Sequence, residues 1–225
     1  MSDQADRHMS FVRPLPVPRL ATFAADPAPV DVDLARSALV IVDMQNDFIH
    51  PDGWFPASGI DPAPLSAAVP AVAVLADTAR RAGMPVVWVN WGVRPDRANL
   101  PDSFVARAAN DGAVIDELPV GPADLVVSKH RPSGFPDTEL DSVLRLRDLT
   151  TLFFAGVNID RCVLATLIDA SARGYDCVLV ADACATSSPP HVTDAVCHIV
   201  RLLYGVTANS SDICPAIAGA TAGKS

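Results

Sequence analysis

AGVNIDRCV, residues 155–163, begins as a run typical of a buried β-strand, passes through a turn and ends in the first turn of a helix. Cys162 stands in that helical turn. A helix N-terminus offers unpaired backbone N–H groups and a partial positive charge, which stabilise a thiolate and can later hold an oxyanion. The stretch therefore predicts one βα unit of an α/β fold and marks Cys162 as a candidate nucleophile.

Two further apolar runs end in charged residues. Residues 39–42 stop at Asp43, and residues 125–128 stop at Lys129. In a doubly wound parallel sheet, ligands bind beyond the carboxyl ends of the strands, so groups at neighbouring strand ends meet at one edge. A carboxylate, an ammonium and a thiol at that edge together predict a cysteine hydrolase.

Each of the three groups has a definite part in such a mechanism. A free thiol has a pKa near about 8.5, and a nearby cation and a helix N-terminus lower it. Lys129 would supply the cation, and Asp43 would take the thiol proton and return it to a leaving amine. Each residue also has a plainer interpretation: Asp43 as a turn or cap residue, Lys129 as a solvated charge and Cys162 as core filling.

The rest of the chain alternates short apolar runs with amphipathic stretches, which is the signature of βα units and a parallel sheet. Strands are predicted near residues 38–43, 85–90, 125–129, 151–156, 177–181 and 205–207. Helices are predicted near residues 64–82, 138–147, 160–173 and 190–203. The connection at 91–124 is long and rich in Pro, Asp, Arg and Asn, which is typical of a lid or a specificity element.

Length and composition predict one folded domain. The 225 residues fit a single α/β domain at 31–225, since such domains commonly reach about 200–250 residues. Residues 1–30 contain five prolines and little periodicity, and we expect an extended arm there. Such an arm either frays or lies across its own domain or a neighbouring subunit. The arm and the long connection favour subunit contacts and hence a homo-oligomer.

Charge and hydropathy exclude several classes of function. The net charge of −9 argues against a nucleic-acid partner, which needs a basic surface. No apolar run approaches the roughly 20 residues of a membrane span, and the N-terminus lacks a signal-peptide pattern, so we expect a cytoplasmic protein. The five cysteines form no CxxC pair and no zinc spacing, which is typical of reduced, mostly buried thiols. A small molecule is the expected partner.

Four sequence blocks resemble the isochorismatase-like cysteine hydrolases. They are VIVDMQNDF (40–48), KHRPSGF (129–135), AGVNIDRCVLAT (155–166) and RGYDCVLVADAC (173–184), and the resemblance extends over about residues 36–208. It implies a doubly wound six-stranded parallel sheet with helices on both faces, similar to a Rossmann fold, and the triad Asp43, Lys129 and Cys162. It also implies a cis peptide bond between Val157 and Asn158, with an oxyanion hole formed by the N–H groups of Asn158 and Cys162.

Departures from individual branches of that family narrow the expected activity. Members that cleave isochorismate lack the nucleophilic cysteine, so Cys162 argues against vinyl-ether hydrolysis. Members similar to nicotinamidase carry metal-binding histidines after the second strand, where this chain reads NWGVRPDR (90–97), so we predict no metal and no cofactor. WGVRPD (91–96), KHRPSGF and the final DAC are most similar to the branch that hydrolyses ureides.

The resemblance therefore implies an amidohydrolase that cleaves a C–N bond of a small linear ureide and releases ammonia. Triuret is the first choice on the resemblance, and its carboxylated product would lose carbon dioxide and leave biuret. Biuret, ureidoacrylate and an N-carbamoyl amino acid are alternative substrates. After these alternatives, the chain could instead be a non-catalytic binding subunit of the same fold.

A ureide is planar and rich in N–H and C=O groups, so its pocket should offer amides, carboxylates and flat walls. Candidate polar contacts are Gln45, Asn46, Asn90, Arg94 and Asn158. Candidate walls are Phe48, Trp54 and Phe135, and Arg161 could contact an anionic substrate. Each of these also has a structural interpretation, as a turn residue, a core side chain or a solvated charge.

Overall fold

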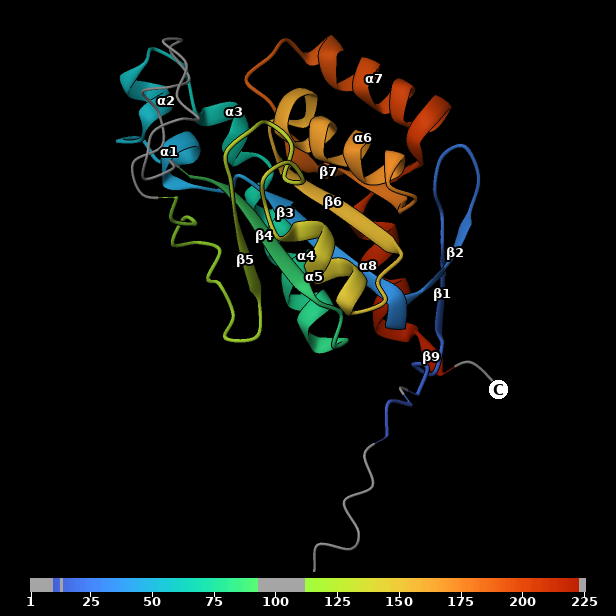
Figure 1. Ribbon diagram of the computed structural model, residues 1–225. Coiled ribbons are helices and arrows are strands. Elements are labelled where there is room, and N and C mark those ends of the chain that lie inside the picture. Colours follow the sequence, from blue (N-terminus) through green and yellow to red (C-terminus); the bar gives the residue numbers. More distant parts are fainter. Residues whose placement is uncertain (1–9, 13, 93–111, 223–225) are drawn as a thin grey trace, which may run out of the picture.

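The computed structural model describes residues 10–12, 14–92 and 112–222, and a six-stranded sheet forms its centre (Figure 1). The strands are β3 (Ser37–Val42), β4 (Val86–Trp91), β5 (Leu125–Lys129), β6 (Thr151–Val157), β7 (Asp176–Ala185) and β8 (Val206–Ala208). Their order is β5-β4-β3-β6-β7-β8, and every neighbouring pair is parallel. The predicted doubly wound six-stranded parallel sheet is confirmed.

The chain changes direction across this sheet between β3 and β6. From β3 it adds β4 and β5 on one side, and it then crosses over to add β6, β7 and β8 on the other. Such a switch leaves a crevice at the carboxyl ends of the two central strands, which is where open α/β sheets bind ligands. Asp43 directly follows β3 and Cys162 follows β6, so both lie at this edge.

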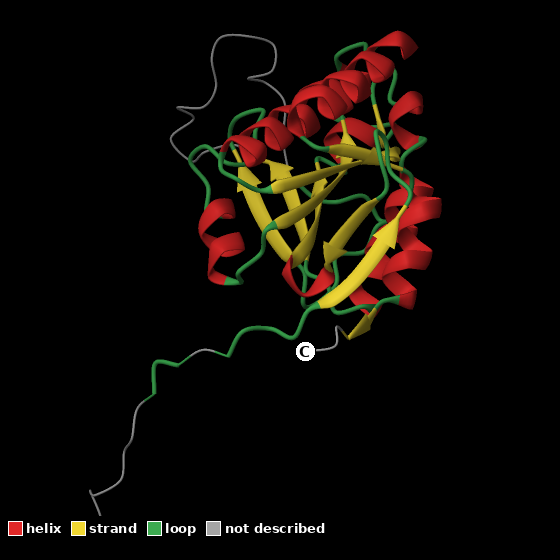
Figure 2. Cartoon of the chain, turned by 90° about the vertical axis from the view of Figure 1, so that its right-hand side faces the viewer, coloured by secondary structure: helices red, strands yellow, loops and turns green. Residues whose placement is uncertain are grey.

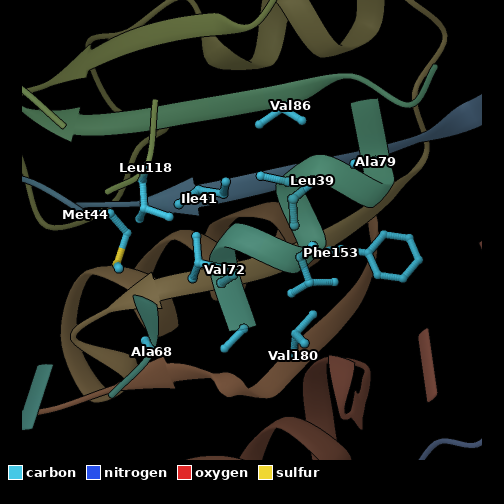
Figure 3. Close-up of a cluster of buried hydrophobic side chains, with 14 of the residues drawn as sticks. Leu39, Ile41, Met44, Ala68, Val72, Ala79, Val86, Leu118, Phe153 and Val180 are labelled. Carbon is cyan, nitrogen blue, oxygen red and sulfur yellow. The ribbon is translucent and has the colours of Figure 1, made fainter. Parts of the chain in front are cut away.

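Helices cover both faces of the sheet, as predicted (Figure 2). One face carries α4 (Val69–Arg81) and α8 (Ser210–Gly219), and the other carries α5 (Leu140–Leu146), α6 (Leu164–Ala172) and α7 (Pro190–Ile199). Successive side chains of a strand point to opposite faces, so β3 contributes to both cores. Leu39 and Ile41 belong to the core under α4 (Figure 3), whereas Val40 and Val42 belong to the core under α5 and α6.

The predicted helix at 64–82 is divided in two. The chain forms α3 (Ala63–Ser66) and then α4, and Pro70 lies in the first turn of α4. Proline is tolerated there because the first N–H groups of a helix have no intrahelical partner, but it cannot continue a preceding helix. The proline therefore marks a new helix start that the apolar periodicity concealed.

Two other predicted helices contain a π-helical turn, at Ile159–Val163 before α6 and at Val200–Tyr204 after α7. The prediction missed α1 (Asn46–Ile49), α2 (Trp54–Ala57) and the C-terminal α8. The first two are four residues long, which is too short to show a helical period.

Residues 19–33 form a hairpin at the edge of the domain. β1 (Arg19–Phe23) pairs antiparallel with β2 (Val30–Asp33) and with β9 (Thr221–Ala222), in the order β2-β1-β9. The loop between β1 and β2 is fixed to β8, since Asp26 N donates to Thr207 O at 2.8 Å. From β1 onward, the predicted arm thus lies across its own domain.

No helix among the described residues is long and apolar enough to cross a membrane. The short 3-10 turn Leu34–Arg36 connects β2 to β3. All five cysteines are free thiols. In the described parts of the chain, no group of three His, Cys, Asp or Glu side chains lies close enough together to hold a metal ion. The cytoplasmic location and the homo-oligomer stay predictions.

Candidate active site

Three predicted side chains meet at the carboxyl edge of the sheet. Asp43 follows β3, Lys129 is the last residue of β5, and Cys162 lies in the π-helical turn after β6. Lys129 Nζ lies 2.9 Å from Asp43 Oδ2, and the two side chains are only 0% and 2% exposed. The Cys162 thiol is within hydrogen-bonding reach of both partners. The sheet topology thus brings together the three groups that the strand ends indicated.

The backbone at Asp43 adopts an uncommon conformation that presents its carboxylate. Its φ is 53°, in the left-handed region that few residues other than glycine adopt. Asp43 N donates to Val89 O at 3.0 Å, and Asp43 Oδ1 accepts a hydrogen bond from Trp91 N at 2.9 Å. The adjacent strand β4 therefore holds both the backbone and the side chain of this residue.

Gln45, a predicted substrate contact, instead fixes the end of β4. Its Oε1 accepts a hydrogen bond from Trp91 N at 2.6 Å, and its Nε2 donates to Trp91 O at 3.1 Å. The side chain is fully buried. Because both ends of the amide bind the backbone beside Asp43, Gln45 supports the site from beneath and does not face the cavity.

The carboxyl end of β6 approaches β3 closely because Gly156 has no side chain. Its φ is 113°, and a Cβ there would lie 2.1 Å from Val42 O. The peptide bond between Val157 and Asn158 is cis, as the family resemblance implied. Asn158 Oδ1 accepts a hydrogen bond from Ser187 N at 3.0 Å, so its side chain holds the turn to the segment after β7.

All three groups have raised pKa values, but burial is the cause only for Asp43 and Cys162. Burial raises the pKa of Asp43, and the nearby Lys129 only partly offsets this. Burial favours the neutral amine of Lys129, but the attraction of Asp43 and Cys162 outweighs it and raises the pKa of Lys129. Burial, followed by repulsion from Asp43, raises the pKa of the Cys162 thiol to about 12.

The raised pKa of Cys162 corrects the expectation of a thiolate. The sequence indicated the cation and the helix N-terminus but not the loss of water or the adjacent carboxylate, and these last two dominate. The raised pKa favours the neutral thiol, and the Asp43 carboxylate lies within hydrogen-bonding reach of it.

A cavity of about 400 Å³ lies above the thiol. It is lined by Asp43, Phe48, Trp54, Phe55, Ile60, Trp91, Pro132, Asn158, Arg161 and Cys162. Phe48 of α1 and Phe55 of α2 meet edge to face, with ring centroids 4.9 Å apart, and Trp54 lies beside both. The indole Nε1 of Trp91 is buried without an acceptor among the described residues. The walls are thus mainly apolar, with four aromatic side chains among the ten lining residues.

The structure divides the predicted substrate contacts into two groups. Phe48, Trp54, Asn158 and Arg161 line the cavity, as the sequence indicated. The prediction missed Phe55, Ile60, Trp91 and Pro132, although Phe55 adjoins Trp54 and Pro132 stands within the KHRPSGF block. Apolar residues in short turns carry no periodic signal, so only their nearness to these motifs could have indicated them.

The remaining candidates lie elsewhere. Asn90 Nδ2 donates to a backbone carbonyl at 3.0 Å, and Asn46 is the first residue of α1 and is outside the cavity lining. Phe135 packs in the core against Tyr175, with ring centroids 6.0 Å apart. Arg94 lies outside the described residues. Of the predicted polar contacts, Gln45 and Asn90 bind backbone groups, whereas Asn158 and Arg161 line the cavity.

The isochorismatase domain model matches residues 37–211. The chain belongs to the isochorismatase family. It is 30% identical to the ureidoacrylate amidohydrolase RutB of Azorhizobium caulinodans, over 84% of this chain and 93% of that protein. It is 32% identical to the protein of the same name from Methylobacterium radiotolerans, over 80% of this chain and 79% of that protein.

Solved structures of this family have the same fold. A cysteine hydrolase from Pseudomonas syringae pv. phaseolicola is 26% identical, with a TM-score of 0.73 over 83% of this chain and 94% of that chain. The N-carbamoylsarcosine amidase of Thermoplasma acidophilum is 32% identical, with a TM-score of 0.65 over 79% of this chain and 98% of that chain. The family and the fold predicted from the four sequence blocks are both confirmed.

Proposed function

We propose that this chain is a cysteine-dependent amidohydrolase that cleaves a C–N bond of a small linear ureide and releases ammonia. The observation that carries the proposal is the buried pair of Asp43 and Lys129 in contact with the thiol of Cys162. Its relatives are amidohydrolases, and the chain is a hydrolase of carbon–nitrogen bonds other than peptide bonds. To this activity the proposal adds that Cys162 is the nucleophile, Asp43 is the base and ammonia is the leaving group.

The first half-reaction forms an acyl-enzyme. The sulfur of Cys162 attacks the carbamoyl carbon while its proton moves to Asp43, so that the thiol with a raised pKa never has to exist as a free thiolate. The carbonyl oxygen becomes an oxyanion at the N–H groups of Asn158 and Cys162. Collapse of this intermediate breaks the C–N bond, and Asp43 returns the proton to the departing ammonia.

The second half-reaction releases the product. Asp43 takes a proton from water, the hydroxide attacks the thiocarbamate carbon, and the C–S bond breaks to restore the Cys162 thiol. The product is an N-carboxylated amine, which loses carbon dioxide. Lys129 keeps its charge throughout and holds the Asp43 carboxylate in place.

The cavity changes the order of the candidate substrates. Triuret, the first choice from the resemblance, consists only of carbonyl and N–H groups and needs many polar partners. The described walls are mainly apolar and include four aromatic side chains, which favours a ureide with a short, flat carbon unit. Ureidoacrylate has such a unit and is the substrate in the name of the RutB relatives. Ureidoacrylate is therefore the first candidate substrate, ahead of triuret, biuret and an N-carbamoyl amino acid.

The test is ammonia release from ureidoacrylate, triuret and biuret. We expect wild type to act on ureidoacrylate most efficiently, and Cys162→Ser to lose activity by roughly a thousandfold or more, because an alcohol is a far weaker nucleophile. Cys214→Ser in α8, outside the cavity lining, is the matched control and should retain full activity. Equal turnover by wild type and Cys162→Ser would contradict the proposal, and an inactive wild type would favour the binding subunit.

A further inference from the structure

Arg161 is the one cationic side chain among the described residues that line the cavity. The other lining residues are six apolar or aromatic side chains, the amide of Asn158 and the reacting pair Asp43 and Cys162. The Arg161 side chain is 43% exposed and therefore open to a ligand. Its position directly before Cys162 places a positive charge within one residue of the nucleophile.

The contacts of Arg161 hold its guanidinium without occupying it. Nη2 donates to Ser188 Oγ at 3.0 Å, and this is one of the five N–H donors of the group. Arg161 also forms an ion pair with Asp160, whose Oδ2 lies 3.7 Å from Arg161 Nε, beyond hydrogen-bonding distance. Among the described residues, Ser188 is thus the only hydrogen-bond acceptor of the guanidinium, and the other donors are open to a ligand.

The carboxylate of Asp160 is already satisfied by hydroxyl groups. Its Oδ1 accepts a hydrogen bond from Thr186 Oγ1 at 2.5 Å, and its Oδ2 accepts one from Ser188 Oγ at 2.8 Å. These bonds hold Asp160 to the segment after β7, and its ion pair with Arg161 is longer than a hydrogen bond. Ser188 bonds both residues, so it fixes the position of Arg161 relative to the turn that carries Cys162.

We propose that Arg161 determines specificity by binding the anionic end of the substrate, which is therefore a carbamoyl compound with a carboxylate at its other end. This inference rests on the proposed function. A carbamoyl carbon at Cys162 and a carboxylate at Arg161 would span the cavity, with the carbon unit between them against the aromatic walls. Because the chain carries a net charge of −9, an anion needs a local cation to bind here.

The test compares two ligands that differ only in charge. N-carbamoyl-β-alanine carries a carboxylate, and 3-ureidopropanol carries a hydroxymethyl group in its place. Their dissociation constants are measured by calorimetry on Cys162→Ala, which cannot turn either of them over. We expect the anion to bind more tightly than the alcohol by roughly tenfold to a hundredfold, as for a charge-assisted hydrogen bond.

Adding Arg161→Gln to that protein should bring the ratio of the two dissociation constants close to one, and Arg161→Lys should keep part of it. Arg147→Gln, which removes the same charge at the exposed end of α5, is the matched control and should keep the full ratio. An unchanged ratio in Arg161→Gln, or a Cys162→Ala protein that does not favour the anion, overturns the inference. Neither result contradicts the proposed cysteine-dependent hydrolysis, which is contradicted only if Cys162→Ser keeps its turnover.

Discussion

Two buried carboxylates in this chain, Asp43 and Asp124, have similar surroundings but opposite properties. Both are nearly inaccessible, with side chains 2% and 3% exposed, and each forms an ion pair, with Lys129 and with Arg80 respectively. Both also bond β4, through Trp91 N for Asp43 and through the Trp88 indole for Asp124. Yet the pKa of Asp43 is raised and that of Asp124 is lowered.

The balance between burial and hydrogen bonding accounts for the difference. Burial by itself would raise the pKa of Asp124, but hydrogen bonds from Arg80, Trp88 and the Gly121 N–H outweigh it. These donors favour the charged form. Asp43 also has three donors, Trp91 N, Lys129 and Cys162, but it is enclosed more completely than Asp124, so burial prevails. A carboxylate that its donors keep charged holds a fold together, whereas one whose burial outweighs its donors accepts a proton more readily.

The positions in the sheet agree with these roles. Asp124 directly precedes β5, at the amino edge, and joins that strand to α4 through Arg80. Asp43 directly follows β3, at the carboxyl edge where α/β sheets bind ligands. One acidic–basic ion pair therefore acts as a structural clamp at one edge of the sheet, and another forms the proposed reaction centre at the other edge.

The largest effect should come from neutralising each carboxylate in turn. Asp43→Asn should lower turnover by about a thousandfold, because it removes the group that accepts and returns the proton. The same variant should make Cys162 react faster with iodoacetamide at pH 7, since Asp43 raises the thiol pKa and Lys129 lowers it. Ammonia release and mass spectrometry of the alkylated cysteines measure the two quantities.

Asp124→Asn is the matched control for that experiment. It should keep wild-type turnover and wild-type labelling, since Asp124 lies at the opposite edge of the sheet. The comparison breaks down if Asp43→Asn keeps its turnover, or if labelling of Cys162 does not become faster when the carboxylate charge is removed.

The next largest effect should come from replacing the cationic partners, and it should appear in the free energy of unfolding. Lys129→Met leaves Asp43 buried without its cation, and breaking a buried pair from one side costs about 3–5 kcal/mol. Arg80→Met should cost less, about 1–3 kcal/mol, because Trp88 and Gly121 still donate to Asp124. Urea denaturation gives both free energies of unfolding.

A double variant sharpens this test. Asp43→Asn combined with Lys129→Met leaves no charge stranded, so it should recover part of the stability lost in Lys129→Met alone. If Lys129→Met lowers the free energy of unfolding no more than Arg80→Met does, Asp43 does not depend on its cation more strongly than Asp124 does.

Asp43, Lys129 and Cys162 could be located from sequence for a physical reason. Parallel strands end at one edge, so the residue at which each apolar run stops is placed by topology alone, and the order β5-β4-β3-β6 brings the ends of β3, β5 and β6 together. Tertiary contacts add little to that placement. The same logic located Arg161, which adjoins the nucleophile in sequence.

The thiol pKa and the cavity walls could not be derived in this way. The pKa of Cys162 depends on lost water and on an adjacent carboxylate, and neither follows from a strand pattern. Gln45 and Asn90 have the polarity of ligand contacts, but they satisfy backbone groups whose partners lie far along the chain. Phe55 belongs to a four-residue helix that has no period to detect.

The smallest expected effect is that the two carboxylates change the free energy of unfolding with pH in opposite directions. The folded-state pKa of Asp124 is lowered, so its contribution to stability is present above the unfolded value of 3.8 and is lost as pH falls below it. The free energy of unfolding of wild type minus that of Asp124→Asn should therefore shrink below pH 4. The folded-state pKa of Asp43 is raised, so the corresponding difference for Asp43→Asn should grow as pH falls toward 3.8. Each slope is at most about 1.4 kcal/mol per pH unit. Urea unfolding from pH 6 to pH 3 measures both, and two slopes of the same sign would remove the distinction between clamp and base.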